Sequence, residues 1–137
     1  MQPEMLAYHA AQVASLLEVA RAHVEQLVLV AGGSWQTRSE LLQHIVSAQS
    51  LKYLALGLPL AKLLLEQSPR QRPYLASETI QGLVTETEYG IALDHIEILF
   101  DPNLQLDPLR LVRTLSHQRL ILLSWPGRFD PPRRAAH

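Results

Sequence analysis

The chain contains no cysteine among its 137 residues. This absence excludes disulfide bridges and thiolate metal sites, and it is compatible with a reducing cytosol. Charged residues make up only 18% and cancel to a formal net charge of −1, so the molecule as a whole has no electrostatic drive toward nucleic acid or anionic lipid. No uncharged apolar run approaches the ~18 residues needed to cross a bilayer, and no basic segment precedes an apolar run at the N-terminus. We therefore expect a cytoplasmic protein with neither a signal peptide nor membrane contact.

Hydrophobic residues account for 47% of the chain, a proportion typical of globular proteins. The length suits one compact domain, because domains commonly run to roughly 100–150 residues. We predict a single α/β domain over residues 1–127. Residues 128–137, with the sequence RFDPPRRAAH, are too rich in proline and charge to pack and are expected to form a flexible tail.

Apolar residues change their spacing repeatedly along the chain, which predicts alternating helices and strands. Helices are expected at residues 3–26, from 34 or 37 to about 46, at 58–67, at 74–86 and from 108 onward. Strands are expected at residues 27–33, 51–57, 89–100 and 119–127, the first of them central in its sheet and covered on both faces. Ser34 or Thr37 is a candidate N-cap, Asp107 with Pro108 begins the last helix, and Pro69 and Pro73 mark a loop.

This alternation predicts a parallel sheet of about four strands with helices on both faces, plus an N-terminal helix. In such sheets ligands bind beyond the carboxyl ends of the strands. The glycine turn after residue 30, Asp94 and the SWPG turn at residues 124–127 would all meet at that edge. Their convergence is the strongest functional indication in the sequence.

The segment LVLVAGGSWQTRSELLQHI has the layout of a phosphate-binding loop between a strand and a helix. A working loop reads GxxxxGK followed by Ser or Thr: its backbone N–H groups wrap the phosphates, its lysine neutralises them and its hydroxyl binds magnesium. In this chain Trp35 and Gln36 occupy the glycine and lysine positions, and only Thr37 matches strictly. The candidate nucleotide-binding residues are Gly32, Gly33, Ser34, Trp35, Gln36, Thr37 and Arg38. Three interpretations remain: a structural relic, a weak nucleotide site, or an ordinary turn.

Two features offer compensation for the missing lysine. The helix N-terminus still presents N–H groups and a partial positive charge to an anion. Arg38 lies one residue beyond the lysine position, where it either reaches a phosphate or is a solvated side chain in the first helical turn.

Asp94 ends an apolar run in the manner of the second nucleotide motif, whose acid holds magnesium through water. Thr37 and Asp94 are therefore the candidate magnesium residues, and Asp94 and Glu97 the candidate catalytic ones; a plain strand-end cap is the alternative for Asp94. His95 replaces the glutamate that often follows the acid in active hydrolases. Arg110 and Arg113 suggest a solvated helix face, or an arginine supplied to a neighbouring subunit.

The loop, the segment YLALGLPLAKLLLEQSPRQRP and the run LDHIEILFDPNLQLDPLRLVRTLSHQRLILLSWPG together resemble BrxF, a family of small P-loop proteins from type 3 BREX bacteriophage-resistance systems. The resemblance covers residues 27–127 and is most specific from Asp94 to the WPG turn. It implies a P-loop NTPase-like fold of the AAA/ASCE-like type, a three-layer sandwich, with ATP and magnesium as cofactors. Carried over by position, Thr37 is the magnesium hydroxyl, Asp94 the strand-end acid, and Gly33 and Ser34 parts of the phosphate cradle. Trp35, Gln36 and His95 depart from the family pattern.

Our leading hypothesis is an accessory subunit of a BREX-type defence complex, with other BREX proteins as partners and ATP binding weakened or lost. An active small ATPase that uses Arg38 and Glu97 is one alternative, and so the sequence leaves open whether the chain is an enzyme. A DNA-contacting adaptor that uses the basic segments PRQRP and PPRRAAH is another. An ATPase-like fold with Arg110 and Arg113 invites ring or dimer contacts, so self-association is a further hypothesis.

Overall fold

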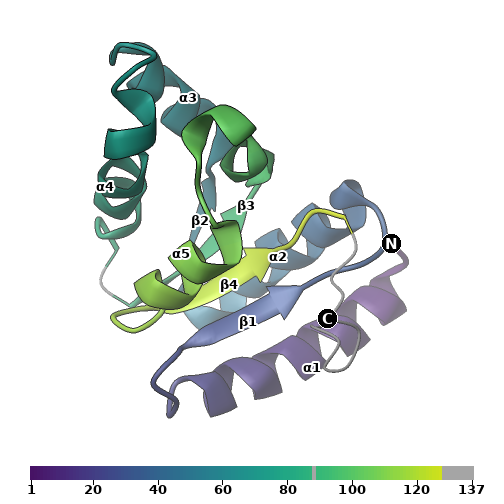
Figure 1. The fold of residues 1–137 in the computed structure, drawn as a ribbon. Helices are drawn as coiled ribbons and strands as arrows, with labels where there is room; N and C mark the ends of the chain where they lie inside the picture. The colour runs from purple at the N-terminus through teal and green to yellow at the C-terminus, as the bar shows by residue number, and fades with distance from the viewer. Residues whose placement is uncertain (88, 128–137) are drawn as a thin grey trace, which may run out of the picture.

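The computed structural model describes residues 1–87 and 89–127. Helices and strands alternate along the chain, as Figure 1 shows. The elements are α1 (Pro3–Ala20), β1 (Leu27–Val30), α2 (Trp35–Gln49), β2 (Lys52–Ala55), α3 (Gly57–Leu65), α4 (Arg72–Val84), β3 (Gly90–Asp94), the short 3-10 helices η1 (Glu97–Phe100) and η2 (Pro102–Leu104), α5 (Pro108–Leu115) and β4 (Leu120–Ser124). The predicted tail at residues 128–137 lies outside the described residues.

The four strands form one parallel sheet in the order β1-β4-β3-β2. The predicted parallel α/β class is therefore confirmed. The position of β1 is a correction, because it is an edge strand of the described sheet and not a central one. Its apolar, β-branched sequence indicates that helices cover both of its faces. An edge strand and a central strand can both be covered in this way, so the sequence does not distinguish them.

Alternating side chains divide the sheet into two apolar faces, as the pleat requires. One face packs against α1 and α2, and the other against α3, α4 and α5, which gives three layers (Figure 1). The first face is formed by Val28, Ala92, Leu120 and Leu122, with Leu17, Leu42 and Ile45 of the helices. The second is formed by Ile91, Leu93, Ile121 and Leu123, with Leu60, Ile80 and Val112. Each fully buried Leu or Ile contributes roughly 1.5–3 kcal/mol, so the two faces supply the main stabilisation.

Several predicted boundaries differ from the observed ones. Helix α1 ends at Ala20 and not near residue 26, since the intervening residues turn back until the Gln26 N–H donates to the Ser116 carbonyl at 3.0 Å. Pro73 lies in the first turn of α4, a position that tolerates proline because its missing N–H has no helical partner there. Strand β3 stops at Asp94, and residues 97–100 form η1 instead of continuing the strand.

The predicted start of α5 is confirmed, because the Asp107 side chain accepts a hydrogen bond from the Arg110 N–H. At the start of α2 the cap is Ser34 and not Thr37. Throughout residues 1–87 and 89–127, no helix combines the length and the apolar character needed to cross a membrane.

Candidate functional site

The glycine loop between β1 and α2 depends on two left-handed residues. Gly32 has φ of 87° and Gly33 has φ of 63°, values that side-chain-bearing residues rarely adopt. A Cβ at either position would meet no atom within 4 Å, so the requirement for glycine comes from backbone conformation and not from crowding. The loop is exposed from Ala31 to Gln36. The sequence therefore builds a real turn here, at the carboxyl end of β1.

The Arg38 side chain fills the inner side of this loop. Only 5% of Arg38 is exposed. Its Nε donates to Ser124 Oγ at 3.0 Å, and its Nη1 donates to the carbonyl oxygens of Gly32 and Gly33, both at 3.0 Å. The expectation of a solvated arginine is therefore wrong: the guanidinium is buried, because the loop carbonyls and the end of β4 provide acceptors for it.

The first turn of α2 uses its own hydroxyl groups. Ser34 Oγ accepts a hydrogen bond from the Thr37 N–H at 3.1 Å, and the Ser34 hydroxyl donates to Thr37 Oγ1 at 3.0 Å. This is a standard N-cap, and such a cap contributes about 1 kcal/mol to stability. The Thr37 hydroxyl and N–H, which a phosphate loop would offer to magnesium and phosphate, are engaged within the helix.

Asp94 lies at the carboxyl end of β3 and is 2% exposed. Its Oδ2 accepts a 2.6 Å hydrogen bond from the Tyr53 hydroxyl, and its Oδ1 accepts one from the His95 N–H at 3.0 Å. His95 Nε2 also approaches Oδ2 to 3.7 Å. Tyr53 is paired with Ala92 in the β2–β3 register, so it shares the α2 face of the sheet with Asp94, two residues further along. The strand-end acid is thus capped by protein groups.

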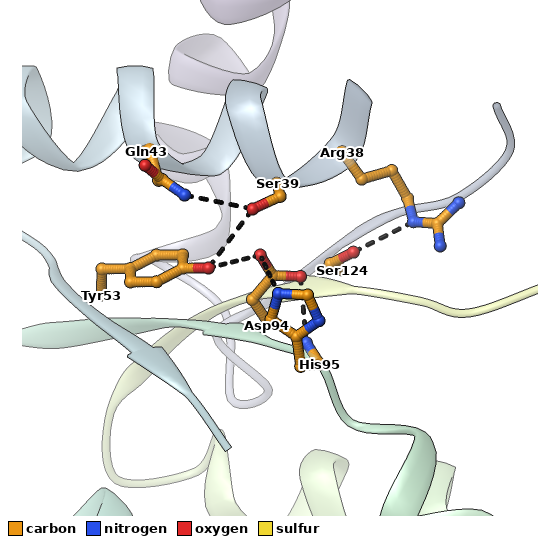
Figure 2. A network of polar contacts seen from close by, with 7 residues as sticks. All are labelled: Arg38, Ser39, Gln43, Tyr53, Asp94, His95 and Ser124. Carbon is orange, nitrogen blue, oxygen red and sulfur yellow. Dashed lines mark hydrogen bonds and ion pairs between the residues drawn. The ribbon is translucent and has the colours of Figure 1, made fainter. Parts of the chain in front are cut away.

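Tyr53 continues this contact into a chain of polar groups beneath α2 (Figure 2). Its hydroxyl lies 3.3 Å from Ser39 Oγ, and Gln43 Nε2 donates to the same Ser39 oxygen at 3.1 Å. Burial and the hydrogen bond to Asp94 raise the pKa of Tyr53, with smaller opposing effects from Ser39 and Gln43. The phenol is therefore held in its neutral, donating form across the physiological range.

His95 and Trp35 form the outer side of the site. His95 has φ of 54°, a left-handed conformation that costs roughly 1–2 kcal/mol for a residue with a Cβ. Its ring lies against the Trp35 indole, with centroids 5.4 Å apart. Trp35 remains 51% exposed at the start of α2. This contact links the helix N-terminus to the end of β3, so the two predicted motifs do lie side by side.

Two further candidates have exposed side chains at the starts of their helices. Gln36 is exposed on α2, and Glu97 is exposed on η1. In the part of the chain that the structure describes, no hydrogen bond or ion pair joins Glu97 to Asp94, and no group of three or more His, Cys, Asp or Glu side chains could hold a metal ion. Arg113, predicted as solvated, is exposed on α5, where its guanidinium donates to both carboxylate oxygens of Glu25 at 2.7 and 2.8 Å.

Magnesium and ATP do not fit the residues as they are arranged. A phosphate loop turns N–H groups and a lysine toward the anion, whereas the carbonyls of Gly32 and Gly33 face inward here and accept from Arg38. The Thr37 hydroxyl is hydrogen-bonded to Ser34 and the Asp94 carboxylate to Tyr53. We therefore derive no hydrolytic step from this site.

Sequence reasoning missed three members of the polar network, Ser39, Gln43 and Tyr53, and it included Ser124 only as part of the SWPG turn. One signal was present for Ser124, since it is a polar residue at the end of the otherwise apolar strand LILLS. No comparable signal marks Tyr53, because a tyrosine in a strand is common. Its role arises only when β2 and β3 are placed in register.

In comparisons with protein-family models, curated proteins and solved structures, no match to this chain was found. Its class is therefore given by its own architecture: a parallel four-stranded α/β domain with helices on both faces and a buried polar network at the carboxyl end of the sheet.

Proposed function

We propose that this chain is a P-loop-like, non-catalytic subunit of a BREX-type phage-defence complex, and that it acts by binding protein partners without turning over ATP. The defence context rests on the resemblance of residues 27–127 to BrxF, above all on the run from Asp94 to the WPG turn. Loss of nucleotide chemistry rests on the arrangement of the site.

The sheet topology supports the P-loop-like part of the proposal. Strand β4 lies between β1 and β3, and all three strands are parallel. The glycine loop after β1 and Asp94 at the end of β3 therefore lie at the carboxyl end of the sheet, on either side of Ser124. A phosphate loop and a strand-end acid that act together need this placement.

The proposal that the site does not turn over ATP rests on one observation: the Arg38 side chain fills the inner side of the glycine loop. Its guanidinium donates hydrogen bonds to two loop carbonyls and to Ser124 Oγ, and only 5% of the residue is exposed. A phosphate entering the loop would meet carbonyl oxygens and would have to displace a cation that already has three acceptors. Burial makes these charge-assisted contacts costly to break.

Calorimetric titration with ATP and magnesium tests this assignment on four proteins. They are the native chain, the Trp35→Gly/Gln36→Lys variant that rebuilds the loop sequence, the same variant with Arg38→Met added, and a control that carries Arg110→Met in place of Arg38→Met. We expect binding only when the loop is rebuilt and Arg38 is removed, with circular dichroism verifying that each variant folds. Binding of ATP by the native chain would falsify the proposal that this site has lost ATP binding, and it would favour the ATPase alternative.

The partner half of the proposal needs a separate experiment. A tagged copy of the chain, expressed together with the remaining genes of its own locus, is expected to copurify with another protein of that locus whether or not ATP is present. Recovery of the chain alone, at low salt and at native expression levels, would contradict the accessory-subunit role while leaving the result of the titration intact.

A further inference from the structure

A groove lies on the other face of the sheet, away from the polar network. Its volume is about 780 Å³, and it runs between the α3–α4 junction and the segment of η1 and η2. Ala61, Leu64, Ile98 and Leu104 contribute apolar lining. Its lining includes Pro69, Arg70, Arg72 and Pro73 of the basic segment PRQRP, and none of its lining residues takes part in the Asp94 network.

Two large apolar side chains that line the groove project into solvent. Leu65 at the end of α3 is 72% exposed, and Tyr74 in the first turn of α4 is 81% exposed. Leu58, also exposed, lies seven residues before Leu65 and so on the same side of α3. Small-molecule sites enclose most of their ligand, whereas here the apolar groups stand outside the hollow. The shape suits a macromolecular surface better than a small ligand.

This surface carries complementary features within a single patch. Tyr74 projects beside a hollow that can accept an aromatic side chain, so a knob and a hole lie next to each other. The lining also contains exposed charges of both signs, Arg70 as a cation and Asp101 as an anion. Arg72 is partly buried, and its Nε donates to the Leu64 carbonyl. In a two-fold dimer the same patch meets itself, and so each feature must find its complement on that patch. A surface of one sign would repel its own copy, but this one offers each copy an opposite charge.

We propose that this groove is a self-association surface, in which a second copy of the chain packs its Tyr74 and Leu65 into the groove of the first. Arg70 of each copy lies near Asp101 of the other in this arrangement. The inference is independent of nucleotide binding, because the groove shares no residue with the glycine loop. It names the surface for the self-association that the sequence left open.

Analytical ultracentrifugation of the full chain, from about 1 μM to about 1 mM, tests the proposal. We expect a monomer–dimer equilibrium whose dissociation constant rises about tenfold or more in Tyr74→Ser and in Leu65→Ser, because each change removes an apolar contact twice in a symmetric dimer. Both side chains are exposed, so the variants retain a folded monomer. Arg70→Glu is expected to weaken the dimer too, with a loss that becomes smaller in high salt.

Matched controls are Tyr8→Ser and Val19→Ser on α1, where both side chains are also exposed and apolar. These should leave the dissociation constant unchanged. A chain that stays monomeric over the whole concentration range overturns the proposal. So does a dimer that responds to the α1 variants and not to Tyr74→Ser and Leu65→Ser, since its interface would then lie on α1.

Discussion

The carboxyl end of the sheet and the α3–α4 groove differ in which side chains they bury and which they expose. Beneath α2, the polar groups are buried and paired: Arg38 donates to Ser124 and to the loop carbonyls. Asp94 accepts from the Tyr53 hydroxyl and the His95 N–H. In the groove, Leu65 and Tyr74 are apolar and exposed. Buried polar groups that are fully paired stabilise the fold of the chain itself, while exposed apolar groups gain only when another surface covers them. The first region therefore completes the monomer, and the second is suited to association.

The largest effect in this comparison is expected from Asp94→Ala. The change leaves the Tyr53 hydroxyl and the His95 N–H without their acceptor in a buried site, and so we expect a loss of about 3 kcal/mol in the free energy of unfolding. Urea denaturation measures it. Glu97→Ala, which removes an exposed acid three residues away, should change stability by less than about 0.5 kcal/mol. Equal effects of the two changes would contradict the buried network.

A smaller and pH-dependent effect is expected from Tyr53→Phe. Losing the hydrogen bond to Asp94 should cost about 1 kcal/mol at neutral pH. The pKa of Tyr53 is raised above its ordinary value of 10.0 by burial and by Asp94. The folded state therefore holds the phenol proton more tightly than the unfolded state, and this contribution is complete below pH 10 and is lost as the pH rises through the folded pKa.

Urea denaturation at several values between about pH 8 and about pH 11 checks this sign. The native chain should lose stability above pH 10 more steeply than Tyr53→Phe does, while Tyr74→Phe should follow the native curve because Tyr74 is exposed. A curve for Tyr53→Phe that is parallel to the native one would show that Tyr53 makes no contribution to the pH dependence.

The smallest effect is expected in the groove. In dilute solution, well below the dissociation constant of the proposed dimer, Leu65→Ser should change the free energy of unfolding by less than about 0.5 kcal/mol, because the side chain is already in solvent. Its effect should appear only as the concentration rises and dimers form. A large loss in the dilute monomer would mean that Leu65 belongs to the core, which would remove the contrast between the two regions.

Local patterns in the sequence predicted the elements well, and the reason is physical. The Asp107–Pro108 start of α5 and the apolar run that ends at Asp94 are each specified within a few residues. The order of the strands is not, and so β1 was expected at the centre of the sheet although it lies at an edge. An apolar strand records which faces are covered, and its neighbours are decided by the whole chain.

In the candidate site, too, some features were predictable from the sequence and others were not. The glycine loop and Asp94 follow strands, and their position was predicted. The role of Arg38 was not, because its partner Ser124 lies 86 residues away and the first turn of a helix is usually exposed. Tyr53 meets Asp94 across a separation of 41 residues. These two contacts are long-range, whereas the signals in the sequence are short-range.

Arg38 has a consequence for how the stability of this protein responds to its surroundings. A site completed by a bound solute gains stability that grows with the logarithm of the solute concentration. The cation that completes this loop is covalently part of the chain, and its effective concentration does not change. The loop should therefore hold its shape equally well in a starved cell and in a growing one.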